Sequence, residues 1–202
     1  VAERLGYHAT PGPFLGHALA GLAISLSGSE AQKEKWLPPL ASGDILGSVA
    51  FAESGDRWQP EEWGLTLAAD NKLTGSKHHV PGGRAAELLV VGLAGGQLGL
   101  VDASDGHLTA NGTQDLDRTR RVANVVFSSA CVDLLPNGVA HSARLRDAAL
   151  VLLAADAVGG AQRCVELSAA YAMQREQFGR AIASFQALKH QLADMAVDLE
   201  PA

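Results

Sequence analysis

The hydrophobic period changes twice along this chain of 202 residues, and these changes limit the folds that it can adopt. Residues 13–26, PFLGHALAGLAISL, are apolar on nearly every side, which is typical of a buried helix. From Gly47 the period becomes two and turn residues recur, as in antiparallel strands. After Pro136-Asn137-Gly138 a helical pattern returns. The order of helices, sheet and helices predicts an α+β protein.

Local signals predict where the helices begin and end. In GSEAQKEKWLPPLASGD, Ser29 should cap a second helix and Pro38-Pro39 should stop it. A long helix is predicted from about Ser142 to Gln177, with Gly179 as its C-terminal stop. We expect Ser184 to cap the last helix. The apolar stripe of that helix, for packing on a neighbour, consists of Phe185, Leu188, Leu192, Met195 and Leu199.

The alternating region predicts an antiparallel sandwich or barrel. We expect its strands near residues 47–52, 65–69, 72–80, 87–93, 98–101 and 122–127. The stretch LLVVGLAGGQLGLVDAS imitates the strand and glycine turn of a dinucleotide-binding reductase. Its spacing is G-x-x-G-G-x-x-G, and a strand pattern follows it where the reductase has a helix. A β-hairpin with a glycine turn is therefore favoured over the Rossmann alternative.

Composition excludes some classes of function. The net charge of −6 and the scattering of 16 Lys and Arg residues argue against nucleic-acid binding. Cys131 and Cys164 lie in apolar surroundings without CxxC spacing, so buried reduced thiols are favoured over a disulfide or a metal pair. His78-His79 has no third ligand at metal-binding spacing. The N-terminal VAERLGYH is unlike a secretory signal, and Asp156 interrupts the longest apolar stretch, so no membrane span is expected.

The stretch REQFGRAIASFQALKHQLADM resembles the C-terminal signature of the acyl-CoA dehydrogenases, flavoproteins that desaturate the α,β bond of acyl thioesters. The residues in register with that signature are Arg175, Gln177, Phe178, Gly179, Ile182, Phe185, Gln186, Leu192, Ala193 and Met195. Three further stretches resemble the family: GSEAQKEKWLPPLASGDILGSVAFAES with Glu53, NKLTGSKHHVPGG, and VVFSSACVDLLP. The resemblance implies part of an N-terminal helical domain (1–46), a β middle domain (47–139) and the first helices of a C-terminal helical bundle (140–202). The chain would then be a partial family member.

The resemblance implies that Arg175, Gln177 and Phe178 reach across a dimer interface to the adenine and diphosphate end of the FAD of a neighbouring subunit. Arginine suits this role because its planar fork donates two hydrogen bonds to phosphate oxygens. Gln186 is expected as a second polar contact there. The alternative is an ordinary arginine near a helix C-terminus, favoured by the helix dipole.

The flavin ring of most family members sits against the β domain, beside two Thr hydroxyls and a Trp. The resemblance places Ala52 and Pro81 at the Thr positions and His79 at the Trp position. Neither alanine nor proline offers a side-chain donor, and proline also lacks a backbone N–H. Backbone groups around Phe51 to Glu53 remain for contact with the ring.

No catalytic residue is assigned. The chemistry needs a carboxylate that removes the α-proton of the thioester. In most members this Glu lies in the later part of the C-terminal bundle. A minority carry it at the position of Ala149, and Asp147 lies off that helix face.

These departures are similar to the heteromeric branch of the family, in which unlike subunits that act on steroid side chains share fewer flavins than chains. The resemblance thus predicts a cytoplasmic subunit of an acyl-CoA dehydrogenase in lipid or steroid catabolism, a β-oxidation type of pathway, in a homo- or hetero-oligomer with a shared FAD site. A non-catalytic partner subunit with a degenerate flavin site is the alternative.

The charged stretch DLDRTRRV, residues 115–122, is most simply a solvated loop before a strand. Alternatively, Arg118, Arg120 and Arg121 meet the phosphates of coenzyme A.

Overall fold

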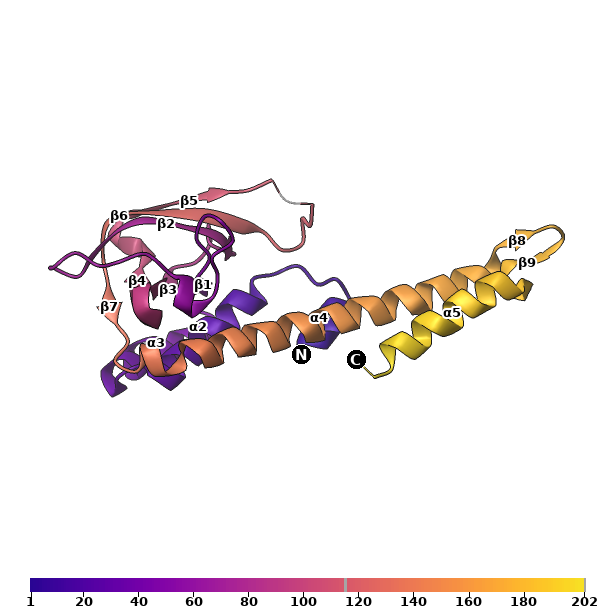
Figure 1. The fold of residues 1–202 in the computed structure, drawn as a ribbon, viewed down its shortest axis with the longest axis horizontal. Coiled ribbons are helices and arrows are strands. Elements are labelled where there is room, and N and C mark those ends of the chain that lie inside the picture. The colour runs from indigo at the N-terminus through magenta and orange to yellow at the C-terminus, as the bar shows by residue number, and fades with distance from the viewer. Residues whose placement is uncertain (115, 202) are drawn as a thin grey trace. The chain divides into compact units, whose positions relative to one another are not determined.

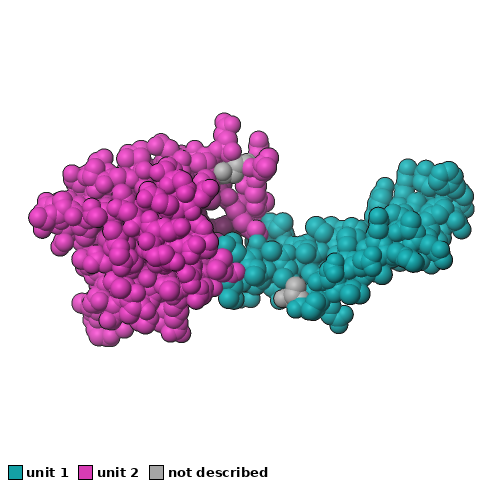
Figure 2. Space-filling model, viewed as in Figure 1, with its two compact units in different colours: residues 1–10, 151–202 teal, residues 11–150 magenta. Residues whose placement is uncertain are grey.

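The computed structural model describes residues 1–114 and 116–201, and the chain forms two compact units (Figure 2). The unit of residues 11–150 contains α2 (Phe14–Ser27), α3 (Glu30–Ser42), β1 (Gly47–Ala50), β2 (Lys72–Pro81), β3 (Leu88–Leu93), β4 (Gln97–Asp102), β5 (Leu108–Gly112), β6 (Val122–Cys131) and β7 (Asp133–Leu134). The unit of residues 1–10 and 151–202 contains α1 (Ala2–Tyr7), β8 (Glu176–Gln177), β9 (Arg180–Ala181) and α5 (Gln186–Leu199). Helix α4 (Gly138–Gln174) contributes residues to both units (Figure 1).

Two sheets form the β region. One has the strand order β1-β3-β4-β7 and the other β2-β6-β5. All pairings are antiparallel except β1 with β3, which is parallel, so the first sheet is mixed and the expected purely antiparallel arrangement is wrong at this point. The chain between β1 and β3 passes through the other sheet, which gives the long connection that a parallel pair requires. Among the described residues the strands do not close into a barrel.

Apolar side chains from both sheets form one core. Its buried members are Ala50, Leu73, Val80, Ala86, Leu89, Val91, Leu93, Val101, Val125, Phe127, Ala130 and Val132. Helix α2 packs against β1 and against α3. The predicted strands coincide with β1, β2, β3, β4 and β6. Exposed and buried residues alternate along parts of β2 and β6, whereas β1 and β3 are buried at every position. Residues 65–69, in contrast, form only the single bridge Leu67↔Leu73, and β5 and β7 were not predicted.

The glycine-rich stretch is a β-hairpin, as predicted, and the Rossmann alternative is wrong. Strands β3 and β4 pair antiparallel from Leu88↔Asp102 to Leu93↔Gln97. The turn between them places Gly95 at φ 72° and Gly96 at φ 73°. These left-handed conformations suit residues without a Cβ.

Helix α3 does not stop at Pro38-Pro39 as expected but contains both prolines and continues to Ser42. It ends at Gly43, whose left-handed φ of 80° lets its N–H donate to the carbonyl of Leu40 at 3.2 Å. The N–H of Ile45 also donates to the carbonyl of Pro39 at 3.3 Å. This C-terminal cap closes the last turn in spite of the two missing N–H groups. At the other end, Ser29 caps the helix as predicted.

Helix α1 contacts α4 at two glycines. A Cβ on Gly6 would lie 1.9 Å from the carbonyl oxygen of Asp156, and a Cβ on Gly159 would lie 1.9 Å from that of Glu3. The Tyr7 hydroxyl also donates a short hydrogen bond to Glu166. The two backbones therefore approach each other more closely than side chains at Gly6 and Gly159 would permit.

Helix α4 is long and apolar enough to cross a membrane by length and composition, with a window of mean hydropathy 1.4 that is 6% buried. Asp156 does not prevent this, contrary to the expectation. Core helices of soluble proteins meet the same condition, so the absence of a membrane span stays a prediction.

Both cysteines are free, but Cys131 and Cys164 are exposed, so the prediction of buried thiols is wrong. Cys131 ends β6, and its Sγ lies 2.7 Å from Lys72 Nζ on the paired strand β2. Apolar neighbours in sequence did not indicate burial here, because successive residues of a strand point to opposite faces.

Candidate functional site

The chain between α4 and α5 folds into a small β-hairpin. Strand β8 pairs with β9, and Phe178 and Gly179 form the turn with φ of 54° and 76°. Positive φ at both central residues is the pattern of a type I′ turn. The predicted long helix is confirmed as α4, but it ends at Gln174 and not at Gln177, and Gly179 lies in the turn of the hairpin.

The hairpin exposes polar donors beside an aromatic ring. The Phe178 side chain is 92% exposed, and its ring lies 6.1 Å from that of Phe185 in an edge-on contact. Arg175 and Gln177 are also exposed, and the Arg175 guanidinium forms no ion pair with any described residue. The structure thus brings Arg175, Gln177 and Phe178 together on one element.

Gln186 is the exposed first residue of α5. The prediction that Ser184 caps this helix is wrong. Its hydroxyl donates to the carbonyl of Ala181 at 2.7 Å, and Phe185 occupies the cap position without a side-chain hydrogen bond. Ser184 is the last residue of a short 3-10 helix, Ile182–Ser184, and its hydroxyl is bonded to the residue that precedes this helix.

In the other unit, the segment that follows β1 is bound to β2 through its carbonyl groups. The Phe51 carbonyl accepts from Lys77 Nζ at 3.1 Å, and the Ala52 carbonyl accepts from the His78 N–H at 2.8 Å. Among the hydrogen bonds of the described residues, none is donated by the Ala52 N–H. The N–H of Phe51, a half-buried residue like Ala52, donates none of them either.

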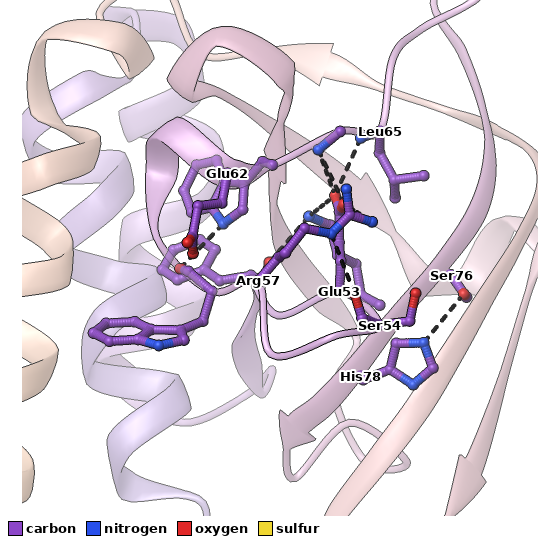
Figure 3. A network of polar contacts seen from close by, with 12 residues as sticks. Glu53, Ser54, Arg57, Glu62, Leu65, Ser76 and His78 are labelled. Carbon is purple, nitrogen blue, oxygen red and sulfur yellow. Dashed lines mark hydrogen bonds and ion pairs between the residues drawn. The ribbon is translucent and has the colours of Figure 1, made fainter.

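Glu53 is the centre of a buried polar network (Figure 3). Its carboxylate lies 2.8 Å from Lys77 Nζ and 3.3 Å from the Arg57 guanidinium. It also accepts from the N–H of Gly64 at 2.9 Å and from that of Leu65 at 3.1 Å. Because Glu53 precedes the loop and Gly64 follows it, the carboxylate closes the base of residues 54–63.

Burial and hydrogen bonding shift both charges of this pair. Burial alone would raise the pKa of Glu53, but hydrogen bonds from Lys77 and from the Gly64 and Leu65 N–H groups outweigh it, so its pKa lies below the usual 4.5. Desolvation lowers the pKa of Lys77 to about 8, although Glu53 acts to raise it. The Lys77 side chain is 0% exposed, and that of Glu53 is 5% exposed.

Trp63 covers this pair with its ring. The ring lies 5.3 Å from Lys77 Nζ and 5.0 Å from the Phe51 ring. Its indole N–H donates to the carbonyl of Trp58 at 3.2 Å. A Cβ on Gly92 of β3 would lie 2.6 Å from the indole, so Trp63 lies directly against this strand.

His79 and Pro81 lie at an irregular part of β2. The register with β6 shifts between Lys77 and Val80, and His79 has a φ of 51°. Such a bulge re-aims side chains, and His79 is exposed. The Pro81 carbonyl accepts a hydrogen bond from the Ser48 hydroxyl. Ala52 and Pro81 accordingly offer no side-chain donor.

The network of Glu53 and Lys77 was not predicted from the sequence. Lys77 stands at an inward position of β2, and a lysine among inward residues of a strand is a signal of a buried partner. The identity of that partner was not visible, because Glu53 lies 24 positions away in the chain.

The arginine-rich segment surrounds an open hollow on the surface. Arg118 and Arg121 line it together with Arg84, whereas Arg120 is not among its lining residues. Asp115, the first residue of this segment, lies outside the described residues. For residues 115–122, both the solvated loop and the contact with coenzyme A phosphates stay predictions.

Neither of the two positions considered for the base at the start of α4 offers a buried carboxylate. The side chain of Asp147 is 62% exposed and accepts from the Arg146 guanidinium at 2.8 Å. At Ala149 the methyl group carries no acid–base function.

Two family models match the chain. Residues 1–44 match the acyl-CoA dehydrogenase N-terminal domain, and residues 146–202 match the acyl-CoA dehydrogenase C-terminal domain. The chain belongs to the acyl-CoA dehydrogenase family. Members of this family bind FAD. The resemblance of REQFG and the flanking residues is thereby confirmed as family membership.

Within this family, acyl-CoA dehydrogenase IpdE2 of Mycobacterium tuberculosis is 34% identical over 100% of the chain and 52% of its own length. The chain therefore spans about half the length of this relative. The solved steroid acyl-CoA dehydrogenase Tcur3481-Tcur3483 is 30% identical with a TM-score of 0.84, over 98% of this chain and 55% of that chain. The ChsE4-ChsE5 complex of Mycobacterium tuberculosis is 26% identical with a TM-score of 0.86, over 99% of this chain and 56% of that chain.

Proposed function

We propose that this chain is part of an FAD-dependent acyl-CoA dehydrogenase that desaturates the α,β bond of an acyl-CoA thioester, and that it works in a hetero-oligomer with a shared FAD site. The observation that carries the proposal is the hairpin at Phe178-Gly179, which exposes Arg175 and Gln177 beside an almost fully exposed ring. Family membership supports the reaction, and the cytoplasm is the proposed compartment.

The hairpin residues fit the adenine and diphosphate end of FAD. Arg175 has a guanidinium without an ionic partner among the described residues, which leaves its fork available for phosphate oxygens. The exposed Phe178 ring suits stacking against a planar base. Gln177 and Gln186 add amide donors. We assign these four residues to the adenine and diphosphate end of an FAD that this chain shares with a partner chain.

The β domain of this chain fits a flavin ring less well. Ala52 and Pro81 lack side-chain donors, and His79 is exposed on a bulge. The Ala52 N–H, which donates no hydrogen bond among the described residues, is the group that would meet a ring acceptor, with Phe51 beside it. One backbone donor gives weaker orientation than several donors together, so we propose that this chain does not hold the ring by itself.

The reaction breaks two C–H bonds, with a proton leaving the α-carbon and a hydride leaving the β-carbon. FAD, when bound, supplies the acceptor for the hydride. The proton requires a carboxylate shielded from water. Because Ala149 carries no acid–base group and Asp147 is exposed, we assign this base to residues other than those at the start of α4.

A steroid-derived acyl-CoA is the proposed substrate class. The support is the likeness to the steroid acyl-CoA dehydrogenase Tcur3481-Tcur3483 and to the ChsE4-ChsE5 complex. Each of these two proteins is named as a pair of components, which agrees with a shared site on unlike chains. The pathway proposed is a β-oxidation of steroid or other lipid side chains.

A non-catalytic partner subunit is the second candidate function. The observation that favours it is the absence of side-chain donors at Ala52 and Pro81 together with the absence of an acid at Ala149. Turnover of an acyl-CoA by the assembled complex, and its loss when Arg175 is changed, would separate the enzyme subunit from this alternative.

The experiment for the hairpin is an FAD titration of the assembled complex with Arg175→Ala. Loss of a charge-assisted fork to phosphate should weaken FAD binding by about tenfold or more. Lys189→Ala is the matched control, because it removes one exposed positive charge from the neighbouring α5. Equal affinity of the Arg175→Ala and Lys189→Ala complexes would contradict the assignment.

A further inference from the structure

We infer that Lys77 and Glu53 are a pair of positioning residues, which hold residues 51–53 against β2 so that the Ala52 N–H is presented to a flavin ring. This inference rests on the proposed FAD site. It gives a role to a buried pair that the proposed function does not otherwise use.

The Lys77 ammonium binds two successive parts of the segment. It donates to the Phe51 carbonyl at 3.1 Å and to the Glu53 carboxylate at 2.8 Å. Between them the Ala52 carbonyl accepts from the His78 N–H at 2.8 Å. All three residues of the segment are thus tied to β2, two of them by one side chain.

Some backbone groups of residues 51–53 have a hydrogen-bond partner within the described chain, and others do not. The carbonyls of Phe51 and Ala52 are bonded to β2, and among the described residues the N–H groups of both have no partner. A Thr at position 52 would add a hydroxyl for orientation, but Ala52 adds none. The position of the Ala52 N–H therefore depends on the backbone, which the bonds from Lys77 and from the His78 N–H hold.

Glu53 extends the same restraint to the loop of residues 54–63. Its carboxylate bonds the N–H groups of Gly64 and Leu65 at the far end of that loop. The Trp63 ring lies over the Lys77 ammonium at 5.3 Å. Within this cover the pair is shielded from water, so its hydrogen bonds are stronger than those of an exposed pair.

The test compares Lys77→Met with Lys72→Met in the full chain assembled with its partner. Lys72 lies on the same strand β2, and its Nζ contacts Cys131 instead of the segment. Met fills the volume of the lysine stem in both variants, which keeps the core packed. Amide hydrogen exchange of His78 and FAD affinity are measured for each.

We expect exchange of the His78 amide about tenfold faster, and FAD binding about tenfold weaker, in Lys77→Met. In Lys72→Met both quantities should stay within about twofold of the wild type. Glu53→Gln should also weaken FAD binding. The double variant should then lose less than the two single losses combined, because it leaves no unpaired buried charge.

A pH profile separates positioning from a general loss of stability. The charged groups that face Lys77 are the Glu53 carboxylate and the Arg57 guanidinium, and the neutral Trp63 indole covers it. With the pKa of Lys77 at about 8, the ammonium loses its proton as the pH rises through that value. FAD affinity of the wild type should fall severalfold between about pH 7 and pH 9, and that of Lys77→Met should not follow this fall.

The two proposals fail in different ways. If the Lys77→Met complex binds FAD as tightly as the wild type, and its His78 amide exchanges at the wild-type rate, the positioning role is overturned. The proposed FAD site is not affected by that result. If the wild-type complex binds no FAD at all, the proposed function is overturned. The role of Lys77 and Glu53 toward the flavin is then overturned as well. Faster exchange at His78 with unchanged FAD affinity would also overturn the role, since the restraint would then not reach the flavin.

Discussion

Ala52 and Pro81 determine how the β domain can meet a flavin. The family resemblance predicts that both stand where most members carry a hydroxyl group, and the group that Ala52 then offers a ring acceptor is its backbone N–H. Glu53 and Lys77, by contrast, make their polar contacts with one another, with Arg57 and with the backbone. At the scale of residues, the orientation of this region is held by buried charges and not by side chains that face a ligand.

Returning a hydroxyl to position 52 should strengthen FAD binding. One additional hydrogen bond of about 1 kcal/mol corresponds to about a fivefold gain in affinity. The measurement is an FAD titration of the Ala52→Thr complex, with Ala52→Val as the control for the added volume. Equal affinities of the two variants would show that position 52 does not face the ring.

Acid should remove the stabilising contribution of Glu53. Its pKa is lowered in the folded chain, so its contribution is fully present above the usual 4.5 and is lost as the pH falls through the folded value. The wild type should have a larger free energy of unfolding than Glu53→Gln at neutral pH. This difference should shrink below about pH 4.5. Urea unfolding at several pH values measures it, and a constant difference down to about pH 3 would contradict the shift.

The elements show which local patterns determine structure and which do not. Period-two alternation predicted β2 and β6, but β5 was missed because LTANG is short and polar. The parallel pairing of β1 with β3 follows from packing between sheets, which a local period does not contain. At the site, the family signature gave Arg175 to Phe178, whereas their hairpin was missed because the helical pattern runs on through Gln177. The pair of Lys77 and Glu53 needs a contact across 24 positions.

The crossing of α1 and α4 should be sensitive to one methyl group. In Gly159→Ala the new Cβ would lie 1.9 Å from the Glu3 carbonyl oxygen, so the backbones must separate, at a cost of about 1–3 kcal/mol. In the control Gly160→Ala the Cβ would lie 3.7 Å from the Gly6 carbonyl oxygen, an ordinary contact. The control should be neutral or more stable by up to about 1 kcal/mol, because alanine favours helix.

Thermal unfolding and hydrogen exchange of the α1 amides measure this difference. Gly159→Ala should lower the Tm and expose the amides of α1, and Gly160→Ala should do neither. Equal Tm values and equal protection in the two variants would show that α1 does not pack on α4 through Gly159.

At the scale of the whole molecule, the chain spans about half the length of a relative such as IpdE2. The unit of residues 1–10 and 151–202 exposes many large apolar side chains, the most exposed being Val1, Val151, Leu153, Leu167, Tyr171, Met173, Phe178 and Val197. Apolar surface of this extent is typical of a surface that other protein segments cover. It agrees with the proposal that the chain functions within a larger assembly.

The visible absorption spectrum tests the central claim most directly, with the chain purified alone and then co-expressed with a partner dehydrogenase chain. A shared FAD site predicts a colourless protein alone and flavin bands after co-expression. A yellow homo-oligomer of the lone chain with one FAD per chain would contradict it, because the β domain would then hold the ring without a partner.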